Sequence, residues 1–558
     1  MYILENLPWF VLFIGVLVFV HELGHFLVAK ACGVKILRFS LGFGPRLFGV
    51  VRGETDYCIS ALPLGGYVKM LGDTPGSDVP EEDAPRAFGS QPVWQRALIL
   101  VAGPGFNLLL ALFVYAGLFV GVHTFGATKL GIVSVGDPAW DAGLRPGDRI
   151  VSIAGEPMRR WDDLQQAVAQ RPGERLTVVY ERAGGRASAT IVPAATKQLN
   201  LLREEEIQGR IGVSLQYLKP IVAVVDRDSP ATAAGLQTGD RIVSVAGRDV
   251  QAWHEVRQAL ATAQVGEVVA FEIARGEKSL RLSVQTAAPR PALTQGLFSA
   301  ADGASAYTGI VSQDTVVERV DAGTPADRAG IVPGDRLLAV TIVGAGGEEV
   351  ERSVGVWAID LSRLKAGEGA ARITVSVQRG GEVLQLPVQL VDKLEEDELK
   401  NTQTVRVFGA YNAADLYGTY TFERPVGAIE ATKEAAKLVA ADMTLIVKGL
   451  ARVVRGSMPF DTMGGPIMLF VIAEKTAKRG WQAYLRMMAM ISVNLGLINL
   501  FPIPVLDGGH LLFCGIEVVR RRPPSVRVRE LANLVGMVVL LLLMALVFRN
   551  DFIRYVLG

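Results

Sequence analysis

The residues best suited to metal binding and catalysis lie near the N-terminus, where the chain reads His21-Glu22-Leu23-Gly24-His25. On a helix, two histidines four residues apart lie on one face, which is the ligand spacing of zinc hydrolases. Glu22 directly follows the first histidine, where its carboxylate can take a proton from water activated by the metal. These residues predict a zinc site with Glu22 as the general base, and they indicate peptide hydrolysis.

The surroundings of this motif indicate a membrane. Residues 8–29 are apolar apart from the motif, and they reach the roughly 20 residues that a membrane-spanning helix needs. Ionisable groups in hydrocarbon cost on the order of 2.5 to 3.5 kcal/mol each in their charged forms. A purely structural helix would not carry three of them, so we predict that the zinc lies within the membrane.

Three further apolar stretches predict additional crossings, at residues 97–122, about 485–519 and 532–548. The chain has 558 residues and a formal net charge of +1, so it is long enough for several domains and gives no indication of nucleic-acid binding. Lys and Arg cluster between the first two and between the last two stretches, which marks these loops as cytoplasmic. We therefore expect four crossings, both termini outside the cytoplasm, and an extracytoplasmic segment over about 123–484. This segment has no cysteine, so disulfides do not hold it.

The outer segment contains an internal repeat with three copies. Each copy has a Pro-Ala pair, then an Ala-Gly pair, then a Gly-Asp-Arg triplet followed by an apolar residue. The corresponding glycines are Gly143, Gly235 and Gly330, which are 92 and 95 residues apart. This spacing is the size of a small domain. Each copy predicts a short helix that ends at the glycine, a Gly-Asp turn and a strand.

The repeat resembles PDZ domains of the permuted bacterial type, in which the strand beside the peptide groove comes last. The predicted domains are residues 127–216, 217–312 and 313–415. The predicted closing strands are residues 210–213, 308–311 and 405–409. Two roles stay open for these copies: binding of extended peptides by strand addition, and steric exclusion of bulky proteins. The third copy differs from the others by a Gly-rich insertion over residues 341–350.

A histidine pair leaves a catalytic zinc ion one protein ligand short. The best candidate is Asp507, which follows the sequence Pro502-Ile503-Pro504. Two prolines this close cannot belong to a continuous helix, and broken backbone at membrane depth requires a covering of protein or a water-filled cavity. Taken alone, Asp507-Gly508 is better explained as a turn at a membrane edge. In combination with a histidine pair inside the membrane, Asp507 is better explained as the third zinc ligand.

Together these motifs resemble the site-2 protease family of intramembrane zinc metalloproteases, in particular its bacterial regulator of sigma-E type. That type is usually described with two PDZ domains, whereas this chain has three copies of the repeat. The resemblance implies a polytopic α-helical membrane protein with four transmembrane helices, which lie within residues 1–126 and 485–558, and with extracytoplasmic tandem PDZ-like α+β domains. It also implies a cytoplasmic re-entrant β-hairpin at about 50–72 and an amphipathic helical region at 416–484. Within that region, residues 435–454 fit an interfacial helix and almost as well a helix packed on a repeat domain.

The resemblance further implies roles for single residues. Gly65 and Gly66 of the hairpin would help to extend a substrate by strand pairing, although the sequence alone fits a turn in a solvated loop. Gly103 and Asn107 match the family in the second span, where we expect helix packing and hypothesise that Asn107 orients a zinc ligand. Asn494 can bind either an opened substrate backbone or a neighbouring helix. The positions linked in the family to substrate handling are Asn494, Asn499, Pro502 and Pro504.

The predicted function is cleavage, within the membrane, of single-span proteins that were already shortened outside it. Substrates of this type include anti-sigma factors and signal-peptide remnants. The expected cofactor is one Zn²⁺ per chain, and the expected partners are such substrates, the lipid bilayer and peptide or protein ligands of the PDZ-like copies. The expected location is the bacterial inner membrane, with both termini and the repeats in the periplasm. The alternative is an inactive membrane scaffold that recruits periplasmic partners, but the complete ligand set argues against it; a PDZ-bearing serine protease would need a nucleophile motif that we do not find.

Overall fold

The computed structural model describes residues 2–73, 79–199, 205–288, 306–344, 348–357, 361, 370–380, 382–396, 402–456 and 464–557. Within this part the chain forms two compact units. The first contains residues 1–123 and 425–558, and the second contains residues 124–397 and 401–424. The boundary falls within two strands that pair with each other, β3 (Gly121–Gly126) and β28 (Thr421–Val426).

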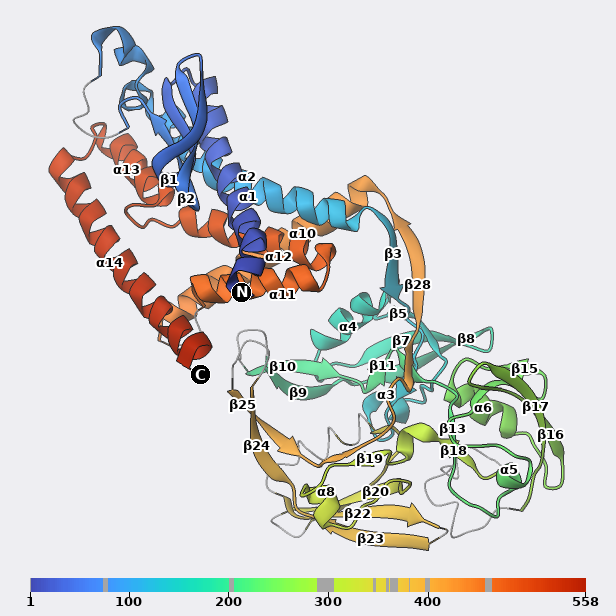
Figure 1. Ribbon diagram of the computed structural model, residues 1–558. Helices are drawn as coiled ribbons and strands as arrows, with labels where there is room; N and C mark the ends of the chain where they lie inside the picture. The colour runs from blue at the N-terminus through green and yellow to red at the C-terminus, as the bar shows by residue number, and fades with distance from the viewer. Residues whose placement is uncertain are drawn as a thin grey trace. The chain divides into compact units, whose positions relative to one another are not determined.

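The first unit is a helical bundle (Figure 1). One part of its core lies where Phe13 and Leu17 of the first helix pack against Ala473, Tyr484 and Met488 of two later helices. Apolar residues that recur at helical spacing lie on one face of a helix, and these contacts bury that face. Its helices are α1 (Tyr2–Ala31), α2 (Val93–Phe119), α10 (Ala428–Val454), α11 (Pro466–Lys478), α12 (Trp481–Asn499), α13 (Asp507–Arg520) and α14 (Val526–Phe552).

Among the described residues, three helices are long and apolar enough to cross a membrane, over Leu7–Ala31, Val93–Phe119 and Val526–Tyr555. They match three of the four predicted crossings. The expected crossing at about 485–519 is instead two shorter helices, α12 and α13, with non-helical backbone between them. The two prolines in this stretch prevent a continuous helix, so the predicted break is confirmed. A fourth crossing stays a prediction.

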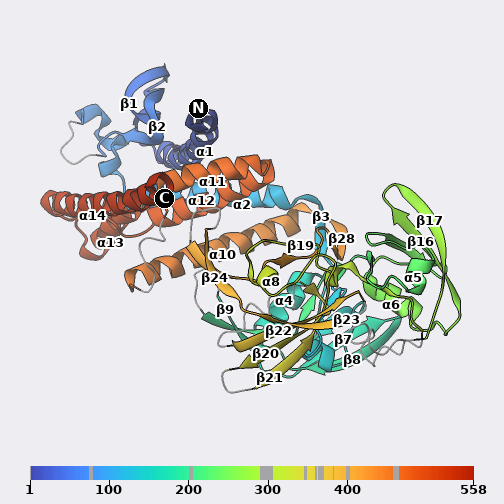
Figure 2. The ribbon, with the colours of Figure 1, turned by 60° about the horizontal axis from the view of Figure 1, so that its bottom comes forward.

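The amphipathic helix predicted over residues 435–454 is part of α10, which begins earlier, at Ala428. Its buried face packs on helices of the same unit, where Ala435 lies among Tyr115 of α2 and Ala489 of α12. The Tyr115 hydroxyl also donates to the Asp442 carboxylate at 2.7 Å. This helix therefore belongs to the bundle of the first unit, as both views show (Figure 1; Figure 2).

The predicted hairpin is longer than expected, because its first strand, β1 (Ile36–Arg52), starts well before residue 50; the second strand is β2 (Thr55–Met70). Both strands bend, so the register gives a curled sheet of four segments in the order 46–52, 55–62, 36–43 and 66–70. The turn lies at Gly53, whereas Gly65 and Gly66 lie within β2. The interpretation of these two glycines as a turn is therefore wrong. Residues 66–70, called the edge segment below, have no strand on their outer side within the described part.

In its described part, the second unit contains three four-stranded antiparallel sheets that share one strand order. Each sheet packs on a short helix and encloses its own apolar core. The sheets are β6 (Glu156–Pro157), β5 (Arg149–Ile153), β7 (Leu176–Arg182), β8 (Gly185–Ile191); β15 (Arg248–Asp249), β14 (Arg241–Val245), β16 (Val268–Arg275), β17 (Lys278–Gln285); and β21 (Glu349–Ser353), β20 (Arg336–Gly344), β22 (Ala370–Arg379), β23 (Glu382–Val388). The short helices are α3 (Pro138–Asp141), α5 (Pro230–Ala233) and α8 (Pro325–Arg328), and longer ones are α4 (Trp161–Ala169) and α6 (Trp253–Leu260).

The Gly-Asp turn has the same contacts in each copy. Its carboxylate is buried and receives two charge-assisted hydrogen bonds from an arginine of the third strand of the sheet, all at 2.7 Å. Such bidentate pairs are strong because both donors fit the carboxylate plane. The glycine that ends each short helix has a positive φ between +81° and +86°, as the predicted left-handed cap requires. The pairs are Asp148–Arg182, Asp240–Arg275 and Asp335–Arg379.

The closing strands pair with the strand that opens each copy. In the first two copies they lie at the end of the predicted ranges, in β11 (Val213–Ser214) and β18 (Ile310–Ser312). In the third copy residues 405–407 belong to a separate hairpin, and the closing strand is β26 (Ala410–Tyr411), so that predicted range is wrong. The remaining strands are β4 (Ile132–Val133), β9 (Ala194–Leu199), β10 (Glu205–Arg210), β12 (Gln216–Leu218), β13 (Val222–Val224), β19 (Arg319–Val320), β24 (Val391–Glu396), β25 (Thr402–Val407) and β27 (Tyr417–Thr419).

Candidate metal centre

The two histidines of the motif lie one turn apart on α1 and point to the same place. Their Nε2 atoms are 3.2 Å apart, and both side chains are buried. The Nδ1 atom of His25 lies 2.8 Å from the Ile99 carbonyl oxygen, which can only accept a hydrogen bond. Nδ1 therefore carries the proton and Nε2 has the free lone pair that a metal requires.

The Asp507 carboxylate completes a triangle of donor atoms. Its Oδ2 lies 3.2 Å from His21 Nε2 and 3.4 Å from His25 Nε2. Within the described residues, these three side chains form the one group of this kind that could hold a metal ion. Asp507 is the first residue of α13, so the positive end of the helix dipole favours its negative charge.

This triangle fits zinc in composition and in size. Two imidazole nitrogens and one carboxylate oxygen are a ligand set of catalytic zinc sites, which keep the fourth position open. Ligands about 2.0 to 2.2 Å from a tetrahedral zinc ion lie about 3.3 to 3.6 Å from one another, and the three edges measure 3.2, 3.2 and 3.4 Å. Without a cation, lone pairs would face each other in a buried space, which is costly.

Helix α2 supports both histidines through close approach. A Cβ built on Gly103 would lie 2.2 Å from His25 Nε2, so only glycine leaves room for this ring. On the partner helix, a Cβ on Gly24 would lie 2.4 Å from the Ala102 carbonyl oxygen. One turn further along α2, Asn107 Nδ2 lies 3.2 Å from His21 Nδ1. Gly103 therefore packs against the ring of His25, in agreement with the helix packing expected for this residue.

The break between α12 and α13 carries Asp507 to the histidines. Its backbone turns tightly, and Val505 has a φ of +90°, a conformation that costs a β-branched residue on the order of 1 to 3 kcal/mol. The glycines after Asp507 do not serve as flexible joints, since both lie in α13. A Cβ on Gly508 would lie 2.2 Å from the Phe501 carbonyl oxygen, and one on Gly509 would lie 2.4 Å from that of Ile503. They are needed for close packing of the helix on the break.

The residues expected to handle substrate lie around this break, at different distances from the triangle. Asn499 ends α12, and its Nδ2 lies 3.4 Å from His21 Nε2. Asn494 is half-buried five residues earlier on the same helix. Pro502 is exposed, whereas the Pro504 carbonyl and ring press on Gly536 of α14. The structure therefore brings Asn499 to the donor atoms, and it brings Pro504 into contact with α14.

Glu22 lies between the donor atoms and the edge segment. It interacts electrostatically with His21, His25 and Asp507. A Cβ on Gly66 would lie 3.2 Å from Glu22 Cγ, and the Val68 backbone N–H donates to the Glu22 carboxylate. Gly65, which precedes the edge segment, is covered by the ring of Phe43.

Comparison with known proteins identifies the family. The sequence profile of peptidase family M50 matches residues 9–543. The chain belongs to this family. Regulator of sigma-E protease RseP of Escherichia coli is 30% identical over 565 residues, which cover 99% of each chain. Protease RseP of Yersinia pestis is 30% identical and covers 99% of this chain and 100% of the relative.

Other relatives agree with the donor set of this M50 peptidase. A Vibrio cholerae protein to which zinc metalloprotease activity is ascribed is 29% identical over 559 residues, which cover 99% of each chain. Among solved structures, a PDZ domain of an SdrC-like protein from Listeria monocytogenes matches 16% of this chain at 20% identity, with a TM-score of 0.13. This last match is too weak to carry an argument. The sequence relatives show that the chain is a zinc metalloprotease, and its apolar helices fit an intramembrane role.

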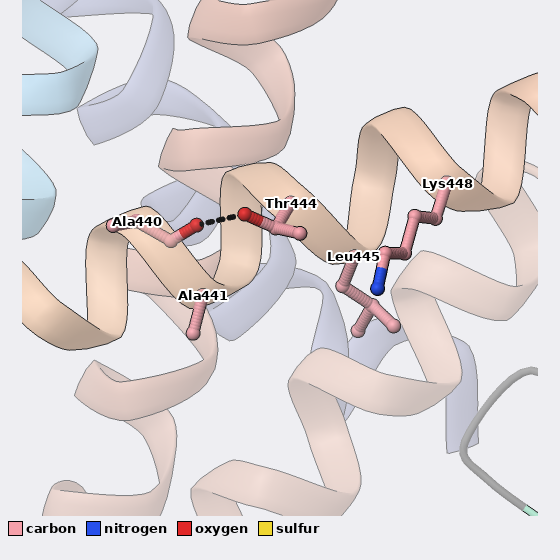
Figure 3. Close-up of a pocket in the computed structure, with 5 residues that line it drawn as sticks. All are labelled: Ala440, Ala441, Thr444, Leu445 and Lys448. Carbon is pink, nitrogen blue, oxygen red and sulfur yellow. Dashed lines mark hydrogen bonds between the residues drawn. The ribbon is translucent and has the colours of Figure 1, made fainter. Parts of the chain in front are cut away.

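A separate hollow of the M50 peptidase lies on α10, away from the donor triangle. Its volume is about 390 Å³, and Figure 3 shows its five lining residues on one helix. The Thr444 hydroxyl donates to the Ala440 carbonyl, which leaves the Lys448 amine as the polar group of the lining. It contains no metal-binding side chain.

The sequence did not predict the Ile99 carbonyl at the metal centre, because a backbone acceptor cannot be recognised from residue type.

Proposed function

We propose that this M50 peptidase cleaves peptide bonds inside the membrane, at a single zinc ion bound by His21, His25 and Asp507. The observation that carries the proposal is the triangle of three donor atoms on apolar helices, with the edges expected for tetrahedral zinc. When bound there, zinc would lower the pKa of a water molecule towards about 7 and polarise a substrate carbonyl. One triangle in the described part supports one ion per chain.

Glu22 acts as the general base and acid. Its carboxylate neighbours the donor atoms without belonging to the triangle, so it is free to move protons. It takes the proton of the attacking water and later gives it to the leaving amine. The Val68 N–H holds the carboxylate beside the edge segment, so proton transfer occurs where an extended substrate would lie.

The edge segment supports a role in substrate extension. A helical substrate must unwind before its carbonyls can react, and an unpaired strand edge offers backbone hydrogen bonds to an extended chain. Gly66 lies in this segment beside Glu22, and Gly65 precedes it. The Asn499 amide is assigned a contact with the substrate group that reacts, because it lies next to His21. The further substrate residues proposed are Asn494, Pro502 and Pro504.

The proposed substrates are single-span membrane proteins already shortened outside the membrane, such as anti-sigma factors or signal-peptide remnants. The proposed location is the bacterial inner membrane, with four crossings, cytoplasmic Lys- and Arg-rich loops, a re-entrant hairpin, and both termini in the periplasm. The similarity to proteins named regulator of sigma-E protease supports this proposal. For the three PDZ-like domains proposed at 127–216, 217–312 and 313–415, the two candidate roles are binding of extended peptides and steric exclusion of bulky proteins.

Replacement of Glu22 by Gln tests the proposal directly. We expect the variant to keep one zinc per chain and to lose cleavage of a model transmembrane peptide by a factor of 10² or more, since general acid–base catalysis contributes this much. Zinc is measured by atomic emission and cleavage by mass spectrometry in detergent micelles. Glu434→Gln, which makes the same change to a carboxylate of α10 that pairs with Lys437 and lies outside the donor triangle, is the matched control. Full cleavage by Glu22→Gln, or a wild-type protein that holds no zinc, would contradict the proposal.

A further inference from the structure

Asn107 is an amide without exposure to solvent in the middle of an apolar helix. Its Nδ2 lies 3.2 Å from His21 Nδ1, and its Oδ1 is buried with no hydrogen-bond partner among the described residues. A buried amide oxygen without a donor costs on the order of 1 to 3 kcal/mol. Such a group in the middle of an apolar helix needs an explanation.

The chemistry of His21 provides one. Its Nε2 is a corner of the donor triangle and needs a free lone pair, so the proton of the neutral ring is on Nδ1. An amide NH₂ group opposite this N–H would set two donors against each other. The oxygen and nitrogen of an asparagine side chain can exchange places by rotation of the amide without moving the other atoms. After the exchange, the amide oxygen accepts from His21 Nδ1–H.

We propose that Asn107 is a positioning residue whose carbonyl oxygen holds His21 in the tautomer that binds zinc. The inference rests on the proposed zinc ligands. It gives Asn107 the same task at His21 that the Ile99 carbonyl has at His25, where the Nδ1 to oxygen distance is 2.8 Å. Both histidines are then oriented by α2, one through a backbone acceptor and one through a side chain.

Helix α12 fixes Asn107 from the other side. The Ser492 hydroxyl donates to the Asn107 backbone carbonyl at 2.8 Å. A Cβ on Gly496 would lie 3.2 Å from the Asn107 Cβ, so α12 and α2 touch here. The side chain is held between the two helices, and its amide has little room to leave His21.

Two substitutions separate the hydrogen bond from packing. Asn107→Leu keeps the size and removes the acceptor, whereas Asn107→Asp keeps an acceptor oxygen. We expect zinc affinity, measured by competition with a chelator, to fall 10- to 100-fold in Asn107→Leu and to stay close to the wild-type value in Asn107→Asp. Leu109→Ala, at an exposed position of the same helix, is the control and should leave zinc affinity unchanged.

A spectroscopic readout keeps the test independent of folding of the variants. In the zinc-loaded wild-type protein, ¹⁵N NMR of His21 should show a hydrogen-bonded proton on Nδ1. A proton on Nε2, equal zinc affinity of Asn107→Leu and wild type, or equal losses in the Leu and Asp variants would overturn the inference. These outcomes leave zinc bound to the wild type, so they differ from failure of the proposed function, in which the wild type binds none.

Discussion

At the residue scale, the metal centre depends on glycines as much as on its ligands. Gly24 and Gly103 let α1 and α2 approach until His25 lies against the backbone of α2. Gly508 and Gly509 do the same for α13 and the break before it. In each case a methyl group would overlap backbone or a ligand ring. Because packed interiors do not accept added volume easily, the donor atoms can take these positions only where glycine provides the space.

Gly103→Ala is a sharp test of this dependence. Its Cβ would lie 2.2 Å from His25 Nε2, so the ring must move and we expect zinc affinity to fall at least tenfold. Gly105→Ala is the matched control, because a Cβ there has no neighbour within 4 Å and gains the same helix propensity. Zinc is measured by chelator competition. Equal zinc affinity of the two variants would show that α2 does not restrain His25.

At the element scale, the edge segment joins the general base to the proposed substrate path. Val68→Pro removes the backbone N–H that reaches Glu22 and blocks strand addition at this point. We expect cleavage to fall about 5- to 13-fold, which corresponds to one lost hydrogen bond of about 1 to 1.5 kcal/mol, with zinc content unchanged. Val68→Thr keeps the N–H and should cleave like wild type. Peptide cleavage by Val68→Pro at the wild-type rate would argue against a role of the edge segment in catalysis.

Elements with local signals could be predicted from the sequence, and contacts between distant elements could not. The break at Pro502 and Pro504 follows from proline stereochemistry, and the Gly-capped short helices follow from residues a few positions apart. The pairing of 36–43 with both 55–62 and 66–70 has no such signal, because it depends on how one strand curls. For the same reason the closing strand of the third copy was predicted too early.

The candidate site divides in the same way. Four-residue spacing on a helix already places His21 beside His25, and the need for a third ligand points to Asp507. The support of these ligands by Ile99 and Gly103 depends on how α1 and α2 pack. Neither a backbone carbonyl nor a glycine can be recognised from residue type as part of a metal site, so both roles can be assigned only from the fold.

At the scale of the whole molecule, the second unit is more than a string of separate repeats. Strand β12, which follows the first copy, pairs with β27, which follows the third. There the rings of Tyr217 and Tyr420 lie 4.4 Å apart, and Lys129 of the first copy lies over Tyr420 and 3.5 Å from Glu255 of the second. These contacts tie the first two copies together through a returning segment of chain.

His254 is largely but not fully buried at this junction, where a Cβ on Gly147 of the first copy would lie 3.1 Å from its Nε2. Burial, together with the positive charges of Lys129 and Arg257, lowers the pKa of His254 to about 4, although Glu255 and Asp148 oppose the shift. The unfolded chain, with a pKa near 6.5, therefore binds the proton more readily than the folded one. Full stability is present above about pH 6.5 and is lost as the pH falls towards 4.

The unfolding free energy of the second unit should thus decrease between pH 6.5 and 4, by about 1.4 kcal/mol for each unit of pKa difference. His254→Gln has no proton to gain, so the difference in stability between wild type and variant isolates this one group from the other titrating residues. Denaturant unfolding of the full chain in micelles, followed at several pH values, measures it. A wild-type-minus-variant difference that stays constant from pH 7 to 4 would mean that His254 is as accessible to protons in the folded unit as in the unfolded chain.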